Sequence, residues 1–194
     1  DRDIGRLIIL HDITNLKKAQ NELRLLANVD SLTGAINRGH FMELAKKEIQ
    51  RSIRYNRKLS LVLMDMDSFK KINDNYGHAS GDQALITLTR ICARGTRKMD
   101  VFARLGGEEF ALLLPETPQE IAAELSERLR EVLASSVIHS ESFEIKTTIS
   151  MGVTEFGIQE QDTFEGLFHR ADKALYKAKV DGRNCVVMWH KGLG

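Results

Sequence analysis

Four carboxylates at the ends of two expected strands are the residues of this sequence best placed to do chemistry. Asp65 and Asp67 close a nearly continuous apolar run from Ser60, which is typical of a central strand buried on both faces. Glu108 and Glu109 follow two glycines that lie between strand-like runs, as in a tight hairpin whose turn needs positive φ. A carboxylate at the tip of a buried strand is costly unless it is paired, hydrogen-bonded or bound to a metal. If the two strands are neighbours, their tips converge into a cluster of oxygen ligands that suits Mg²⁺.

The alternative is that these four side chains are solvated turn acids. Gly106 and Gly107 weigh against it, because glycines beside the acids let a ligand's phosphates approach the backbone. Other chemistries find little support: the sequence has no P-loop, no Rossmann glycine motif and no Gly-x-Ser-x-Gly elbow. Its six histidines are scattered and form no His-Glu-x-x-His, which makes a histidine-based zinc site a poor prediction.

Composition favours one ordinary globular domain. The chain has 194 residues, 42% hydrophobic and 28% charged, with a formal net charge of +1. Such a balance offers no strong basic field for a nucleic-acid polymer, and no apolar run is long enough to span a membrane. Cys92 and Cys185 lie far apart, which fits a reducing, cytoplasmic location. The sequence begins with Asp1 and is interpreted as a piece of a longer protein, which could itself be membrane-tethered.

The first thirty residues are expected to form a strand and then a helix. The β-branched run 5–14 is either a strand of this domain or, as favoured here, the last strand of an upstream domain, so that 1–14 is a remnant. Across 15–29 the apolar residues recur at heptad spacing. This helix is either packed on its own domain or forms a two-stranded coiled-coil linker.

Residues 30–190 are expected to form the main domain. Helices are predicted over 41–57, 69–75, 81–94, 119–134 and 164–180, and strands over 60–66, 101–105, 109–114, 143–153 and 184–189. A hairpin embedded among helices indicates an α+β fold, in which helices flank a central, mostly antiparallel sheet.

Residues Arg104–Phe110, Arg-Leu-Gly-Gly-Glu-Glu-Phe, resemble the signature of the GGDEF family of diguanylate cyclases in its Gly-Gly-Glu-Glu-Phe form. The resemblance extends over residues 28–190. Four further motifs of the family follow its order along the chain: Asp30–Arg38, Asp65–Asp74, Tyr76–Asp82, and Ala171–Lys179 with Gly182–Asn184. The family's fold is similar to the polymerase palm and nucleotide cyclases, which agrees with the α+β prediction. Upstream, His11-Asp-Ile-Thr14 before a charged helix resembles the end of a PAS sensor domain.

The resemblance implies a reaction and a metal. The family condenses two GTP into cyclic di-GMP and releases two pyrophosphates, with Mg²⁺ or possibly Mn²⁺. It implies that Asp65 and Glu109 hold the metal, with the Met66 carbonyl as a further ligand. Glu108 is then expected near the attacking 3′-hydroxyl as its base, and the division of roles between Glu108 and Glu109 stays open.

The resemblance also implies how GTP is bound and why two subunits are needed. Each subunit would hold one GTP, and the reaction would occur between the subunits of a two-fold homodimer. Such a homodimer favours the interpretation of residues 15–29 as a coiled-coil linker. The implied substrate contacts are Asn73, Asp82 and Leu85 at the guanine, the backbone N–H groups of Phe69 and Lys70 at the phosphates, and Lys179 and Arg183 as phosphate cations.

A second site is implied by Arg97-Lys-Met-Asp100, which ends six residues before Gly106. It resembles the Arg-x-x-Asp site at which the product, cyclic di-GMP, inhibits the family. Arg128 could add a guanidinium from a partner domain, and the alternative is an ordinary charged loop. The competing functions are a receptor domain without catalysis and a mononucleotide cyclase. An active cyclase is favoured because the hairpin acids, Asp65 and the implied substrate contacts are intact.

Overall fold

The computed structural model describes residues 28–140, 143–157 and 162–193. The expected strand 5–14, the PAS-like remnant and all but the last two residues of the expected helix 15–29 lie outside this part. The coiled-coil prediction therefore stays a prediction.

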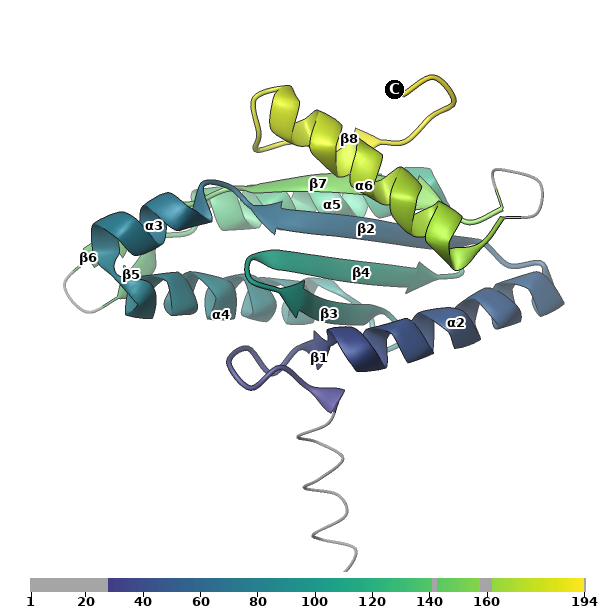
Figure 1. Cartoon of the computed structure of the whole chain (residues 1–194), viewed down its shortest axis with the longest axis horizontal. Helices are drawn as coiled ribbons and strands as arrows, with labels where there is room; N and C mark the ends of the chain where they lie inside the picture. Colours follow the sequence, from purple (N-terminus) through teal and green to yellow (C-terminus); the bar gives the residue numbers. More distant parts are fainter. Residues whose placement is uncertain (1–27, 141–142, 158–161, 194) are drawn as a thin grey trace, which may run out of the picture.

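A six-stranded sheet forms the centre of the domain, in the order β1-β3-β4-β2-β7-β8 (Figure 1). The three inner pairings are antiparallel, and the two outer strands pair in parallel with their neighbours. The prediction of an α+β fold with a mostly antiparallel sheet is confirmed. The strands are β1 (Ile36–Asn37), β2 (Leu59–Met66), β3 (Val101–Gly106), β4 (Glu109–Pro115), β7 (Ile149–Glu155) and β8 (Val186–Met188).

Helices cover both faces of this sheet, and the side chains of β2 alternate between them. Leu61 and Leu63 pack in the core under α2 (Arg38–Tyr55) and α6 (Phe164–Val180). Met64 and Met66 pack on the opposite face, in the core formed with α3, α4 and α5. Every residue of β2 is buried, as predicted for a central strand. The helices on this second face are α3 (Phe69–Tyr76), α4 (His78–Gly95) and α5 (Gln119–Ser135).

The single strand predicted over 143–153 is wrong. Its first part, β6 (Phe143–Ile145), pairs with an unpredicted strand, β5 (Ile138–Ser140), in a separate two-stranded sheet. Only from Ile149 does the chain join the main sheet. Ile145, Thr147 and Ile149 are all buried, so the alternation of burial continues through the break and conceals it. Within the described residues, no helix has the length and hydrophobicity needed to cross a membrane.

Candidate active site

The turn between β3 and β4 lies at the end of the sheet where β2 finishes (Figure 1). The antiparallel register sets Asp65 opposite Glu109, and the Met66 N–H donates to the Glu108 carbonyl over 3.3 Å. Gly106 and Gly107 have φ of 150° and 53°, values that favour glycine. The neighbouring strand tips expected from the sequence are therefore present, and three of the four carboxylates gather there.

The side chain of Arg104 links this turn to Asp30. Its Nε donates to the Gly107 carbonyl at 2.9 Å, and its Nη1 donates to Asp30 Oδ1 at 3.0 Å. Asp30 also accepts hydrogen bonds from the backbone and hydroxyl of Thr33. Burial alone would raise the pKa of Asp30, but the hydrogen bonds from Thr33 and Arg104 outweigh it and hold the pKa below its ordinary value. Both residues belong to the family motifs of the sequence, but no local pattern predicts this contact.

Asp65 is the buried acid of the site, with 8% of its surface exposed. Burial raises the pKa of its carboxyl, and the charges of Glu108 and Glu109 raise it further. Lys179 opposes them, because its Nζ lies 2.7 Å from Asp65 Oδ2. The site therefore gathers negative charge that one ammonium only partly neutralises.

This donor set fits Mg²⁺ with a phosphate ligand. Within the described residues, no three Asp, Glu, His or Cys side chains come close enough together to hold a metal by themselves. Mg²⁺, however, is usually bound through one or two carboxylates plus substrate phosphates. Asp65 and Glu109 on adjacent strands provide that arrangement with oxygen donors alone.

Asp67 does not join the carboxylate cluster. Its Oδ1 accepts from the Ser150 hydroxyl at 2.6 Å, and its Oδ2 accepts from the Thr148 hydroxyl at 2.6 Å and the Asn184 N–H at 3.0 Å. Its oxygens are thus occupied by three donors from two other parts of the chain. Asp67 connects the end of β2 to β7 and to the turn before β8, which is a structural role.

The implied guanine contacts lie on the paired helices α3 and α4. A Cβ added to Gly81 would lie 2.0 Å from Asn73 Oδ1, so the glycine allows Asn73 to pack directly against the first turn of α4. Asp82 is the next residue and is exposed, whereas Leu85, one turn further on, is buried in the core. Asn73 and Asp82 are therefore accessible from solvent, whereas Leu85 belongs to the buried apolar layer beneath them, called the apolar floor below.

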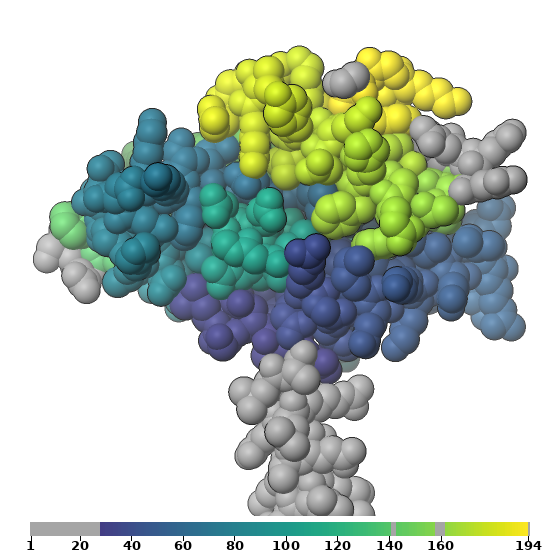
Figure 2. Space-filling view, in the orientation of Figure 1, coloured from purple at the N-terminus to yellow at the C-terminus, as the bar shows by residue number. Residues whose placement is uncertain are grey.

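The implied phosphate contacts come from two elements that meet beside Asp65. Phe69 and Lys70 open α3, directly after Ser68 with its left-handed φ of 55°. Lys179 lies in the last turn of α6, and Arg183 follows in the turn after it, with φ of 67°. In Figure 2 the hairpin is exposed between α3 and α6. The structure brings Lys179 to Asp65, whereas Arg183 lines a cavity together with Ser68.

Arg97, Asp100 and Arg128 line a separate cavity of about 120 Å³. Asp100 Oδ2 accepts the Arg97 N–H at 2.7 Å, while Oδ1 is buried and has no partner. Burial raises the pKa of Asp100, against the opposing effect of Arg97. Arg128 reaches this cavity from α5 of the same chain, so its presence beside the pair does not depend on a partner domain.

Comparisons with known proteins point to one family. Residues 27–185 match the family described as "Diguanylate cyclase, GGDEF domain". The diguanylate cyclase DgcM of Escherichia coli is 40% identical over 181 residues, which cover 93% of this chain and 43% of that protein. The chain thus spans less than half the length of this relative.

Two solved structures share the fold. The coiled coil and GGDEF domain of DgcB from Caulobacter crescentus, in complex with c-di-GMP, is 27% identical with a TM-score of 0.86. That likeness covers 91% of this chain and 93% of that one. The active GGEEF domain of a diguanylate cyclase from Vibrio cholerae is 29% identical with a TM-score of 0.75, over 80% of this chain and 98% of that one.

Proposed function

Because the chain belongs to the GGDEF family of diguanylate cyclases, we propose that it condenses two GTP into cyclic di-GMP and releases two pyrophosphates. One observation carries the proposal: the Gly-Gly-Glu-Glu turn sets Glu109 opposite the buried Asp65, with Lys179 in contact. Phosphoryl transfer depends mainly on positioning and charge neutralisation, and this arrangement supplies both.

In this proposal, Asp65 and Glu109 hold Mg²⁺, or Mn²⁺ in its place, with the Met66 carbonyl as a further ligand. The bound ion would neutralise charge on the reacting phosphates. Glu108 accepts the proton of the attacking 3′-hydroxyl. This role is supported by the position of Glu108 in the turn next to Glu109, where the Glu108 backbone carbonyl accepts a hydrogen bond from the Met66 N–H.

The guanine is read by Asn73 and Asp82, above the apolar floor to which Leu85 contributes. A carboxylate that accepts from the guanine amide and amine rejects adenine, because adenine leaves the site's polar groups unpaired. The backbone N–H groups of Phe69 and Lys70 bind the phosphates. Lys179 and Arg183 neutralise the phosphate charge from the other side.

Each domain carries one set of these residues, so the reaction takes place between two copies. The 3′-oxygen of one GTP attacks the α-phosphate of the GTP on the partner, in both directions, around a two-fold axis. We assign residues 15–29 to a coiled-coil linker that orients the two copies, and residues 1–14 to the end of a PAS-like sensor domain. The likeness to a DgcB structure that contains a coiled coil supports this assignment.

The metal assignment is tested by the Glu109→Gln variant. Incubation with GTP and Mg²⁺, followed by chromatography and mass spectrometry, is expected to yield cyclic di-GMP from the original chain. Loss of a carboxylate ligand is expected to lower turnover by at least about 100-fold, with unchanged thermal unfolding because Glu109 is exposed. The matched control is Glu43→Gln, an exposed acid on α2. Normal turnover in Glu109→Gln would contradict the assignment, and an inactive original chain, free of copurified product, would favour a receptor.

We also propose that cyclic di-GMP inhibits the domain at Arg97, Asp100 and Arg128. The support is their common cavity and the unpartnered Asp100 Oδ1, which is suited to accept a guanine N–H. Arginine pairs with guanine or with phosphate through two parallel hydrogen bonds. Inhibition would then shift the population from productive to unproductive dimers.

Arg97→Ala tests this second site. The substitution keeps the backbone N–H that holds Asp100, so only the guanidinium is lost. The inhibition constant for added cyclic di-GMP is expected to rise at least about tenfold, with the uninhibited rate unchanged. Lys98→Ala, the exposed neighbour, is the control. Equal inhibition in both variants would remove the site from the proposal.

A further inference from the structure

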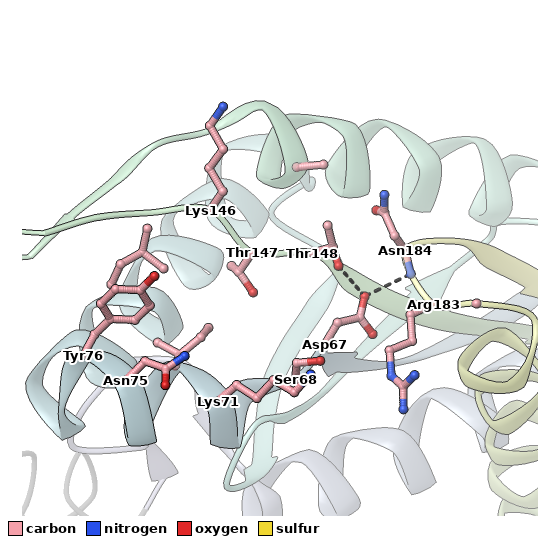
Figure 3. A pocket seen from close by; sticks show the side chains of 14 residues that line it. Asp67, Ser68, Lys71, Asn75, Tyr76, Lys146, Thr147, Thr148, Arg183 and Asn184 are labelled. Atoms are coloured by element: carbon pink, nitrogen blue, oxygen red, sulfur yellow. Dashed lines mark hydrogen bonds between the residues drawn. The ribbon is translucent and has the colours of Figure 1, made fainter.

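A cavity of about 430 Å³ opens between α3, the segment that links β6 to β7, and the turn after α6 (Figure 3). Its volume falls in the range of roughly 300–1,000 Å³ that is common for small-molecule sites. Ile72, Tyr76 and Ile145 contribute an apolar side. None of the proposed metal and guanine contacts lines it, whereas Arg183, a proposed phosphate contact, does.

The rest of the wall is strongly cationic. Lys71, Lys146 and Arg183 line the cavity, and none of them forms an ion pair within the described residues. Asp67 is the one acid among the lining residues, which leaves the cavity with a net positive charge. Unpaired cations around a pocket of this size favour a ligand that carries more than one negative charge.

The single negative charge of Asp67 is outweighed by the three cations that line the cavity. The oxygens of Asp67 already accept three hydrogen bonds, two of which are drawn in Figure 3, from Thr148 and Asn184. The carboxylate is therefore directed toward β7 and the Asn184 backbone. The cationic side chains remain the groups available to an anion.

Thr147 supplies an independent sign that the cavity binds a hydrogen-bond acceptor. Its side chain is 6% exposed, and its hydroxyl is buried without a hydrogen-bond partner. Figure 3 shows this hydroxyl directed into the cavity, on the side facing α3. A buried hydroxyl left unpaired costs free energy, and a bound acceptor in the cavity would pair it.

The cavity adjoins the phosphate end of the proposed substrate site. Ser68 and Arg183 line it; Ser68 directly precedes Phe69 and Lys70, and Arg183 is a proposed phosphate contact. We propose that the cavity is a second polyphosphate site, which takes up inorganic pyrophosphate through Lys71, Lys146, Arg183 and the Thr147 hydroxyl. The inference rests on the proposed function only for the source of the pyrophosphate, which is the leaving group of the reaction.

Titration calorimetry of the full chain with pyrophosphate, in the absence of GTP, tests the proposal. Lys146→Gln is expected to weaken binding at least about fivefold, because a charge-assisted contact is lost. Lys173→Gln, an exposed lysine on α6 outside the cavity, changes the net charge equally and is expected to bind as the original chain does. Equal binding by all three proteins would overturn the proposal.

Thr147→Val separates a binding role from a structural one. Valine keeps the shape and removes the unpaired hydroxyl, so the melting temperature without ligand is expected to stay the same or rise. The rise in melting temperature caused by pyrophosphate is expected to shrink. An unchanged ligand-induced rise would contradict the role of Thr147.

Lys179→Gln distinguishes the cavity from the proposed GTP site. Lys179 does not line the cavity, so pyrophosphate binding is expected to persist in this variant. Binding that is lost in Lys179→Gln but unchanged in Lys146→Gln and Thr147→Val would locate pyrophosphate in the GTP site and overturn the inference. A chain that binds pyrophosphate in the expected pattern but forms no cyclic di-GMP would refute the function and leave the site intact.

Discussion

Asp65 is a residue whose charge the folded domain tolerates poorly. Burial raises the pKa of its carboxyl, and Glu108 and Glu109 add to the effect, while Lys179 offsets part of it. A raised pKa in the folded state means that the unfolded chain releases this proton at lower pH. The stability of the folded state therefore falls as the pH rises from the ordinary Asp value of 3.8 through the raised pKa. At neutral pH the charge of Asp65 is a cost that binding of a cation would remove.

Asp65→Asn is thus expected to stabilise the metal-free domain while abolishing turnover. We expect a gain of about 0.5–1 kcal/mol in the free energy of unfolding at pH 7, and a smaller gain at pH ~3, below the ordinary Asp value of 3.8, where the carboxyl is mostly protonated in both states. Urea unfolding with a chelator at the two pH values measures this. Asp172→Asn, an exposed acid on α6, serves as the control. A variant that is less stable at pH 7 than the original chain would contradict the electrostatic account.

Some of the contacts that fix the elements around the site could be predicted from the sequence, and others could not. The sequence predicted the tip of β2 and the hairpin turn, because a nearly continuous apolar run and paired glycines are local signals. The contact between Asp30 and Arg104 joins residues 74 apart in the chain, and no local pattern encodes a partner at that distance. The same holds for the break between β6 and β7, since burial alternates through it while the pairing partner changes.

Asp67 joins three elements, and its removal is expected to weaken all of them. Asp67→Ala leaves the fully buried Ser150 hydroxyl, the Thr148 hydroxyl and the Asn184 N–H without their acceptor. We expect a loss of about 2–3 kcal/mol in the free energy of unfolding, measured by urea denaturation. Asp74→Ala on the exposed side of α3 is expected to change it by less than about 0.5 kcal/mol. Equal effects of the two substitutions would show that the hydrogen bonds of Asp67 do not stabilise the folded domain.

At the scale of the whole molecule, one domain supplies half of the reaction centre in the proposed mechanism. Glu109 and Asp82 are exposed, as expected for groups that face a second nucleotide-bearing copy. Only the family resemblance predicted from the sequence that a second copy is required, since neither periodicity nor composition encodes a two-fold axis. The heptads across 15–29 are the local pattern that speaks for a fixed partner.

The proposed dimer predicts how the rate of cyclic di-GMP formation depends on protein concentration. If the copies associate reversibly, cyclic di-GMP formation per mole of protein is expected to rise with protein concentration and then level off, because only the dimer is active. Leu23→Asp, at an apolar heptad position, is expected to shift this rise to at least about tenfold higher concentration. Gln20→Asp introduces the same charge at a polar position of the same heptads and is the control. If the helix instead packs on its own domain, Leu23→Asp lowers the melting temperature and leaves the concentration dependence unchanged. A specific activity that stays constant while light scattering reports monomers would exclude a site shared between two copies.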